Sequence, residues 1–122
     1  MILNIDPVSS LQAATKQYVD NVIQIGTYKG NGATGTKKRS ITFRKNPKFV
    51  FICQVVKPSI SIFGMFYVSG SNYAIAPIEG SITQDRCIMN VSVNNGVFSW
   101  DVIHDEVGFN FKNRNYYYIG IL

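Results

Sequence analysis

The spacing of apolar residues is helical in one short segment near the N-terminus. Ser9 followed by Gln12 fits a capping box, and Gly26 is a natural stop, so the sequence predicts a helix of about 15 residues. The positions on its apolar side follow alternating steps of four and three: Leu11, Thr15, Tyr18, Val22 and Ile25. These steps fit the a/d seam of a coiled coil and equally an amphipathic helix that packs on its own domain.

After Gly26 the pattern becomes one of short strands separated by turn signals. The β-rich runs are SITFR, KFVFICQVV, SISIFGMFYV, NYAIAP, CIMNVSV, VFSWDVI, VGFNF and NYYYIGIL. Closely spaced short strands are typical of a sandwich or barrel, and no helical crossover favours a parallel α/β sheet. We therefore predict a mainly β fold, with an N-terminal arm and oligomerisation helix over residues 1–25 and an antiparallel β-sandwich head over residues 26–122.

One hairpin can be predicted in register. Asn95-Gly96 is the strongest two-residue hairpin signal, and a loop there pairs Val93 with Phe98 and Val91 with Trp100. One face of the hairpin is then entirely apolar: Met89, Val91, Val93, Phe98, Trp100 and Val102. This register predicts that Trp100, the single tryptophan, belongs to the core and is not a platform for stacking sugars.

Two strands are apolar on both faces, which a strand in a two-layer fold rarely is. They are Phe49–Val56 and Ile60–Val68. Either a second subunit covers the extra face, or the helix and loops of the same domain do. Alternation also divides the last strand into two sets, which we predict as core (Tyr117, Ile119, Ile121) and as a surface for a neighbour or ligand (Tyr116, Tyr118, Gly120, Leu122).

The net charge is +5, and half of the basic residues cluster in one stretch: Lys37, Lys38, Arg39, Arg44, Lys45 and Lys48. Such a cluster suits an anionic polymer, or it is a solvated edge strand. No nucleic-acid motif accompanies it, so no nucleic-acid partner is expected. No apolar run is long enough for a membrane helix, and MILNIDPVSS lacks the features of a secretory signal, so synthesis in the cytoplasm without membrane insertion is expected.

Candidate catalytic groups are few and poorly arranged. Cys53 and Cys87 lie far apart and lack metal-ligand spacing, and a dyad of Cys87 with His104, the single histidine, has no orienting group. Glu79 and Asp85 flank one turn, but nothing distinguishes them from ordinary loop acids. We predict no enzyme activity, no metal and no cofactor.

Candidate binding residues come from two places. Tyr67 and Tyr73 flank the SGSN loop, where an aromatic rim could hold a sugar ring. Lys37, Lys38 and Arg39 could contact an anionic ligand.

Several stretches resemble bacteriophage tail-fibre and baseplate-associated proteins. The segment Ala13–Asp20, AATKQYVD, resembles their linker helix, and GTYKGNG, Pro47-Lys48 and NYYYIGIL resemble parts of their fibre-tip domains. The resemblance implies a homotrimeric virion protein of the tail, and more weakly a tip that binds a host-surface glycan. We therefore expect a tail-fibre tip that attaches to the host cell. The alternatives are a structural baseplate or tail component that contacts other phage proteins, and a hydrolase of surface polysaccharide.

Overall fold

The computed structural model describes residues 15–19, 21–54, 64–76, 88–105 and 108–122. A short helix, seen at residues 15–19 and 21–22, precedes the strands. The strands are β1 (Ile23–Lys29), β2 (Gly35–Thr42), β3 (Phe49–Gln54), β4 (Met65–Val68), β5 (Tyr73–Ile75), β6 (Ile88–Asn94), β7 (Val97–Val102) and β8 (Asn115–Ile121). The predicted mainly β class with one preceding helix is confirmed.

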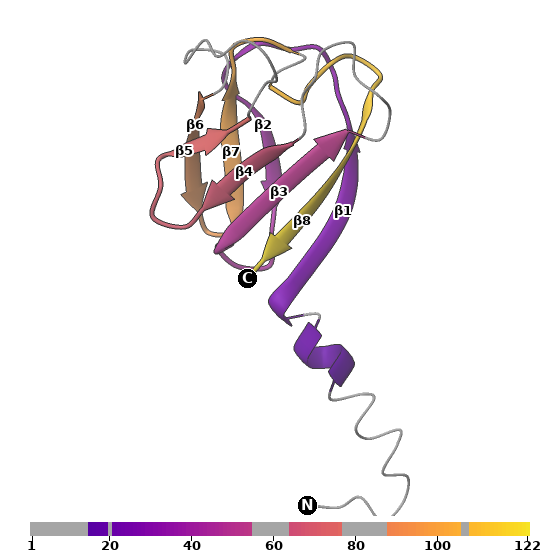
Figure 1. Ribbon diagram of the computed structural model, residues 1–122, viewed down its shortest axis with the longest axis vertical. Helices are drawn as coiled ribbons and strands as arrows, with labels where there is room; N and C mark the ends of the chain where they lie inside the picture. Colours follow the sequence, from indigo (N-terminus) through magenta and orange to yellow (C-terminus); the bar gives the residue numbers. More distant parts are fainter. Residues whose placement is uncertain (1–14, 20, 55–63, 77–87, 106–107) are drawn as a thin grey trace, which may run out of the picture.

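The strands pair in a single antiparallel sheet, in the order β1-β8-β3-β4-β5-β6-β7-β2. The sheet curls, so that β7 and β2 lie behind β4 and β3 (Figure 1). The predicted β-sandwich is not confirmed in that form, because β5 and β6 continue the hydrogen bonding from one layer into the other. The curl still places the apolar side of both layers in one shared interior.

The two edges of the sheet approach each other, and side chains bridge them. The Gln24 amide of β1 donates to the Thr42 carbonyl at 3.0 Å and accepts from the Arg44 backbone N–H at 3.0 Å. The Arg44 guanidinium in turn donates to the Ile23 carbonyl at 2.8 Å. The Gln24 side chain thus supplies the donor and acceptor that a neighbouring strand would offer, and it satisfies backbone groups beside the β2 edge of the sheet.

The helix ends earlier than the sequence predicts. β1 starts at Ile23, so Ile25 lies in a strand opposite Ile119 of β8 and not on the helix. Gly26 is likewise a strand residue, and a side chain there would collide with the ring of Tyr118. The physical reason is tertiary: pairing with β8 outweighs a local stop signal, and the glycine makes room for an aromatic ring.

The interior of the curl is apolar and rich in aromatic rings. Trp100 is fully buried, with its ring centroid 5.6 Å from that of Phe98 and 5.9 Å from that of Tyr28. Its indole N–H donates to the Gly108 carbonyl at 2.8 Å, so the one polar atom of the side chain is satisfied. The predicted core position of Trp100 is confirmed.

The predicted hairpin is also confirmed. Asn94 pairs with Val97, Val93 with Phe98 and Val91 with Trp100. Both turn residues have positive φ, 51° at Asn95 and 83° at Gly96, as a type I′ turn requires.

For the last strand, the predicted assignment of faces is wrong. The residues that face the core are Tyr116, Gly120 and Leu122, with Tyr118 packed beside them, whereas Tyr117 and Ile121 are exposed. Alternation defined the two sets but not which one faces inward. The structure selects the glycine-containing set because the Phe43 ring lies against Gly120, and because the buried Tyr116 hydroxyl accepts a hydrogen bond from the Phe111 N–H at 2.9 Å.

Candidate interaction surfaces

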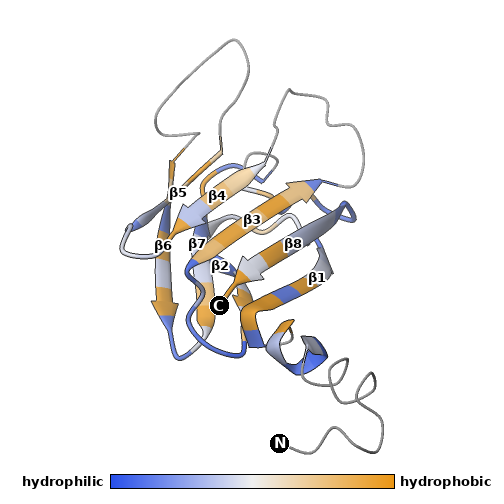
Figure 2. Ribbon diagram, turned by 60° about the horizontal axis from the view of Figure 1, so that its bottom comes forward, coloured by the Kyte–Doolittle hydropathy of each residue, from blue (hydrophilic) through white to orange (hydrophobic). Residues whose placement is uncertain are grey.

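The outside of the curled sheet carries apolar side chains in cross-strand register. Adjacent partners form one row across β1, β8, β3, β4, β5 and β6: Ile25, Ile119, Phe51, Phe66, Ile75 and Ile88. A second row runs beside it through Ile23, Ile121, Phe49 and Val68. We call these two rows together the outer apolar face. In Figure 2, which colours residues of both faces, the hydrophobic colouring covers most of β3 and part of β1.

The outer apolar face is open to solvent in the single chain. Ile25 is 70% exposed and Val68 is 59% exposed, and Phe66 and Ile75 are also exposed. The rings of Phe51 and Phe66 pack on each other with centroids 4.9 Å apart. Val50, Ile52 and Met65 on the opposite side of the same strands are buried. The predicted two-sided apolar character is confirmed for β3 and β4, while residues 55–63 lie outside the described part.

The described residues of the helix are mostly exposed. Its ribbon lies beyond one end of the curled sheet in Figure 1. Thr15 is exposed, and Tyr18 and Val19 are exposed by 69% and 44%. Val22 is half-buried at the junction, where its carbonyl accepts from the Leu122 N–H at 2.6 Å. Of the predicted seam, Leu11 lies outside the described residues.

At the opposite end of the sheet, two loops are joined around a buried asparagine. The side-chain oxygen of Asn110 accepts from the Asn31 N–H at 3.0 Å. Its amide group donates to the Asn31 side-chain oxygen at 2.7 Å and to the Ala33 carbonyl at 2.9 Å. The neighbouring Phe109 is fully buried with φ at 56°, an uncommon conformation for a bulky residue. These contacts hold residues 30–33 against residues 109–114.

Tyr28 strengthens the same junction from β1. Its buried hydroxyl donates to the Phe109 carbonyl at 2.8 Å, and its ring stacks on Tyr116 with centroids 5.1 Å apart. Burial, with a smaller contribution from Tyr116, raises the pKa of Tyr28 well above its usual value. Tyr28 therefore stays protonated and remains a hydrogen-bond donor.

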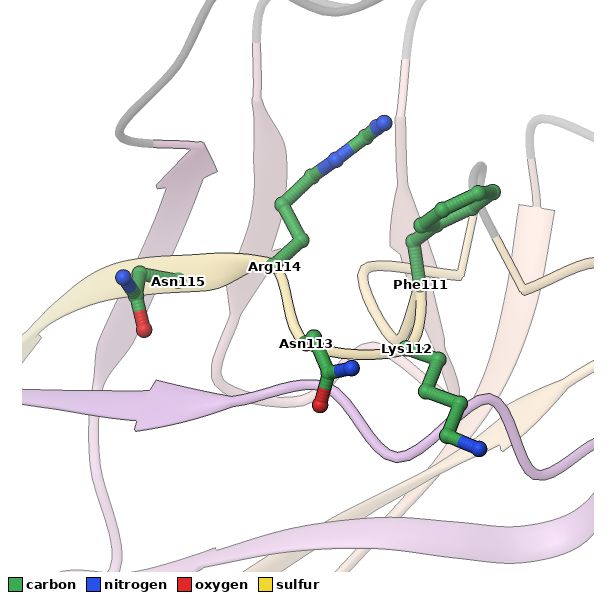
Figure 3. Close-up of a pocket in the computed structure, with 5 residues that line it drawn as sticks. All are labelled: Phe111, Lys112, Asn113, Arg114 and Asn115. Carbon is green, nitrogen blue, oxygen red and sulfur yellow. The ribbon is translucent and has the colours of Figure 1, made fainter.

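The second of these loops forms a small, open hollow of about 220 Å³ lined by Phe111, Lys112, Asn113, Arg114 and Asn115 (Figure 3). The Arg114 guanidinium lies 4.3 Å from the centroid of the Phe111 ring and donates to the Gln54 side-chain oxygen at 2.9 Å. Lys112 is exposed and leaves the loop on another side. An aromatic ring with two cations can contact the ring face and acidic groups of a sugar. The sequence analysis missed this loop because its order comes from Asn110, which is distant from its partners in sequence.

The predicted aromatic rim does not form from Tyr67 and Tyr73. Tyr67 is only 5% exposed and points into the core, with its ring centroid 5.0 Å from that of Phe98. Burial accordingly raises the pKa of the Tyr67 hydroxyl. Tyr73 is exposed, but it points outward from β5, so the two rings lie on opposite sides of the sheet.

The predicted basic residues of β2 differ in their environments. Lys37 and Lys38 are exposed, and the Lys37 backbone N–H donates to the Asp101 carboxylate at 2.8 Å. Arg39 is half-buried, and its guanidinium lies 4.6 Å from the centroid of the Tyr28 ring. Lys37 and Lys38 are therefore available to a ligand, whereas Arg39 also packs across the gap between the two sheet edges.

The candidate catalytic groups named from the sequence form no arranged site in the described part of the chain. His104 lies 3.7 Å from the Asp105 carboxylate, and Cys53 is a free thiol whose pKa is raised by burial. Cys87, Glu79 and Asp85 lie outside the described residues. Across residues 15–19, 21–54, 64–76, 88–105 and 108–122, no three His, Cys, Asp or Glu side chains come together as a metal site would require.

In comparisons with known proteins, no family model, no curated protein and no solved structure matches this chain. In the part of the chain that the structure describes, no helix has the length and apolar character needed to cross a membrane.

Proposed function

We propose that this chain is a homotrimeric attachment protein of a bacteriophage tail-fibre tip, which binds a host-surface glycan or anionic wall polymer without catalysis. The observation that carries the proposal is the short helix directly before β1, on which Tyr18 and Val19 are exposed. A lone helix of this length is marginally stable in water, so it needs a packing partner. Because Tyr18 and Val19 are exposed in the single chain, we propose that identical helices meet in a short three-stranded coil.

Binding at the tip would use the cationic end of the head. Lys112 and Arg114 line the loop hollow. Lys37 and Lys38 lie near the start of β2, which follows the loop of residues 30–33. Individual contacts of this kind are weak. Three linked sites can nevertheless bind a repetitive polymer strongly, because the second and third contacts form at high effective concentration.

The first experiment tests the helix. Placing a carboxylate on the proposed seam with Tyr18→Glu should shift the mass in solution from three copies of the 13.7 kDa chain toward one copy. Tyr18 is exposed in the single chain, so the head should stay folded. Light scattering after size-exclusion chromatography measures the mass, and Gln17→Glu, an exposed change outside the proposed seam, is the matched control. A trimer that survives Tyr18→Glu unchanged argues against the helical bundle.

The second experiment tests the ligand. The double variant Lys37→Glu and Lys38→Glu should weaken adhesion to host cells or wall extracts, with the larger loss at low salt because screening is weaker there. Lys45→Glu with Lys48→Glu changes the net charge equally at the opposite end of the head and should bind nearly as the parent does. Equal loss in both double variants would indicate a non-specific charge effect, and no loss would remove β2 from the binding surface.

The second candidate function is a structural baseplate or tail component with no receptor contact. The outer apolar face favours it, because apolar surfaces of this kind are typical of assembly contacts. Isolated protein that fails to bind host cells or wall extracts at low salt, yet forms its oligomer, would favour this candidate over attachment.

A further inference from the structure

We propose that the outer apolar face is a second self-association surface, on which the β-sheet head packs against a second copy of this chain. This inference rests on the proposed function for self-association of the chain, and its third argument also uses the proposed helical bundle. The helix and the outer apolar face are separate surfaces, and each can be tested without the other.

The extent of the face is the first argument for a partner chain. If each side chain exposes about 200 Å² when fully accessible, the six exposed members of the two rows together expose roughly 600 Å². Monomeric proteins rarely expose contiguous apolar patches beyond about 300–600 Å². A stable interface buries about 800 Å² on each partner. The exposed part of the face is therefore at the upper limit for a monomer, and it supplies about three quarters of the area that one side of a stable contact buries.

The charge distribution is the second argument, and it favours a second copy. The chain carries a net charge of +5, so two copies repel each other wherever their basic surfaces meet. The outward side chains of β8, β3, β4, β5 and β6 include no charged residue. On β1 only Lys29 is charged, and it lies at the end of that strand. Copies can therefore meet on this face without burying or opposing their charges.

The position of the face relative to the helix is the third argument. β1 follows the helix directly and carries Ile25, whose side chain is the most exposed of the first row. Helices that associate would bring the start of each β1 close to that of its neighbour. The outer apolar face begins at this strand, so the heads would meet along it with little further ordering.

The register of the rows also suits packing of one sheet on another. Ile119, Phe51 and Phe66 are direct cross-strand neighbours, so their side chains form a continuous ridge. Two such sheet faces interdigitate at about 10 Å. A ridge of this kind fits another sheet face better than it fits a small ligand, which a concave site would enclose.

The test compares two substitutions at equally exposed apolar positions. Val68 on the outer apolar face is 59% exposed, and Ile103, after β7 and outside that face, is 58% exposed. In the full chain, Val68→Glu should raise the concentration at which the oligomer dissociates by about tenfold or more, as expected for a carboxylate at an interface. Ile103→Glu should leave that concentration unchanged. Sedimentation velocity across a dilution series measures both, and circular dichroism checks that each variant is folded.

Ile75→Glu, on a different strand of the same face, repeats the test where Val68→Glu fails to fold. Assembly of both folded outer-face variants at the parental concentration overturns the proposal. The proposal is also overturned if the parent chain is monomeric and Val68→Glu lowers only the stability of the fold. The outer apolar face would then be covered by other parts of the same chain.

Comparison with Tyr18→Glu separates this inference from the helical bundle. Dissociation by Tyr18→Glu alone supports the bundle and overturns the role of the outer apolar face. Dissociation by Val68→Glu alone supports the face and overturns the bundle. Loss of assembly in both variants indicates that the two surfaces act together.

Discussion

Trp100→Ala is expected to lower the free energy of unfolding by about 3–5 kcal/mol, the usual cost of truncating a large buried aromatic residue. Trp100 is fully buried between Phe98 and Tyr28, so its removal leaves a cavity that these rigid neighbours fill poorly. It also leaves the Gly108 carbonyl without its donor. The free energy of unfolding of small domains is only about 5–15 kcal/mol, so the variant should be only marginally stable.

Urea unfolding followed by far-ultraviolet circular dichroism measures this loss, because the variant lacks the single tryptophan that fluorescence would report. Trp100→Phe is the informative companion, since it keeps most of the ring but removes the N–H donor. We expect a loss of about 1–3 kcal/mol for it, the cost of an unsatisfied buried carbonyl. A loss below about 1 kcal/mol for Trp100→Ala would contradict the buried position of the indole ring.

Asn110→Ala is expected to cost about 2–4 kcal/mol, because it removes several hydrogen bonds at once from a fully buried site. The Asn31 N–H and the Ala33 carbonyl lose their partners, and water has little access to replace them. The loop of residues 30–33 should then separate from residues 109–114. Amide hydrogen exchange should report the change as faster exchange at Gly32, whose N–H donates to the Asn110 carbonyl at 2.7 Å.

Asn115→Ala is the matched control, since Asn115 is exposed on β8 and lines the same hollow. It should change stability by less than about 0.5 kcal/mol, as surface substitutions usually do. If the two alanine variants unfold alike, the Asn110 side chain does not join the loops. If Asn110→Ala also weakens adhesion while Asn115→Ala does not, the order of the loop matters for the proposed ligand site.

The sequence alone was sufficient where local rules and alternation act together. Asn95-Gly96 specifies a turn with two positive φ angles, and the turn sets the register that buries Trp100. The same alternation showed that β3 has two apolar sides. Both results follow from chemistry within a few residues, so they do not depend on where other strands lie.

What the sequence could not determine was which side of each strand faces inward and where distant segments meet. Alternation divided β8 into two sets, but the set predicted as core was the wrong one, because Phe43 packs against Gly120 of the other set. The sequence predicted Gly26 as a helix stop, whereas in the structure it is a strand residue paired with Tyr118. Asn110 lies 79 positions from its partner Asn31 in the sequence, and no local pattern encodes their contact. Tertiary structure decided these points because each depends on a contact between segments far apart in the chain, whereas the hairpin and the alternation of apolar residues depend on neighbours alone.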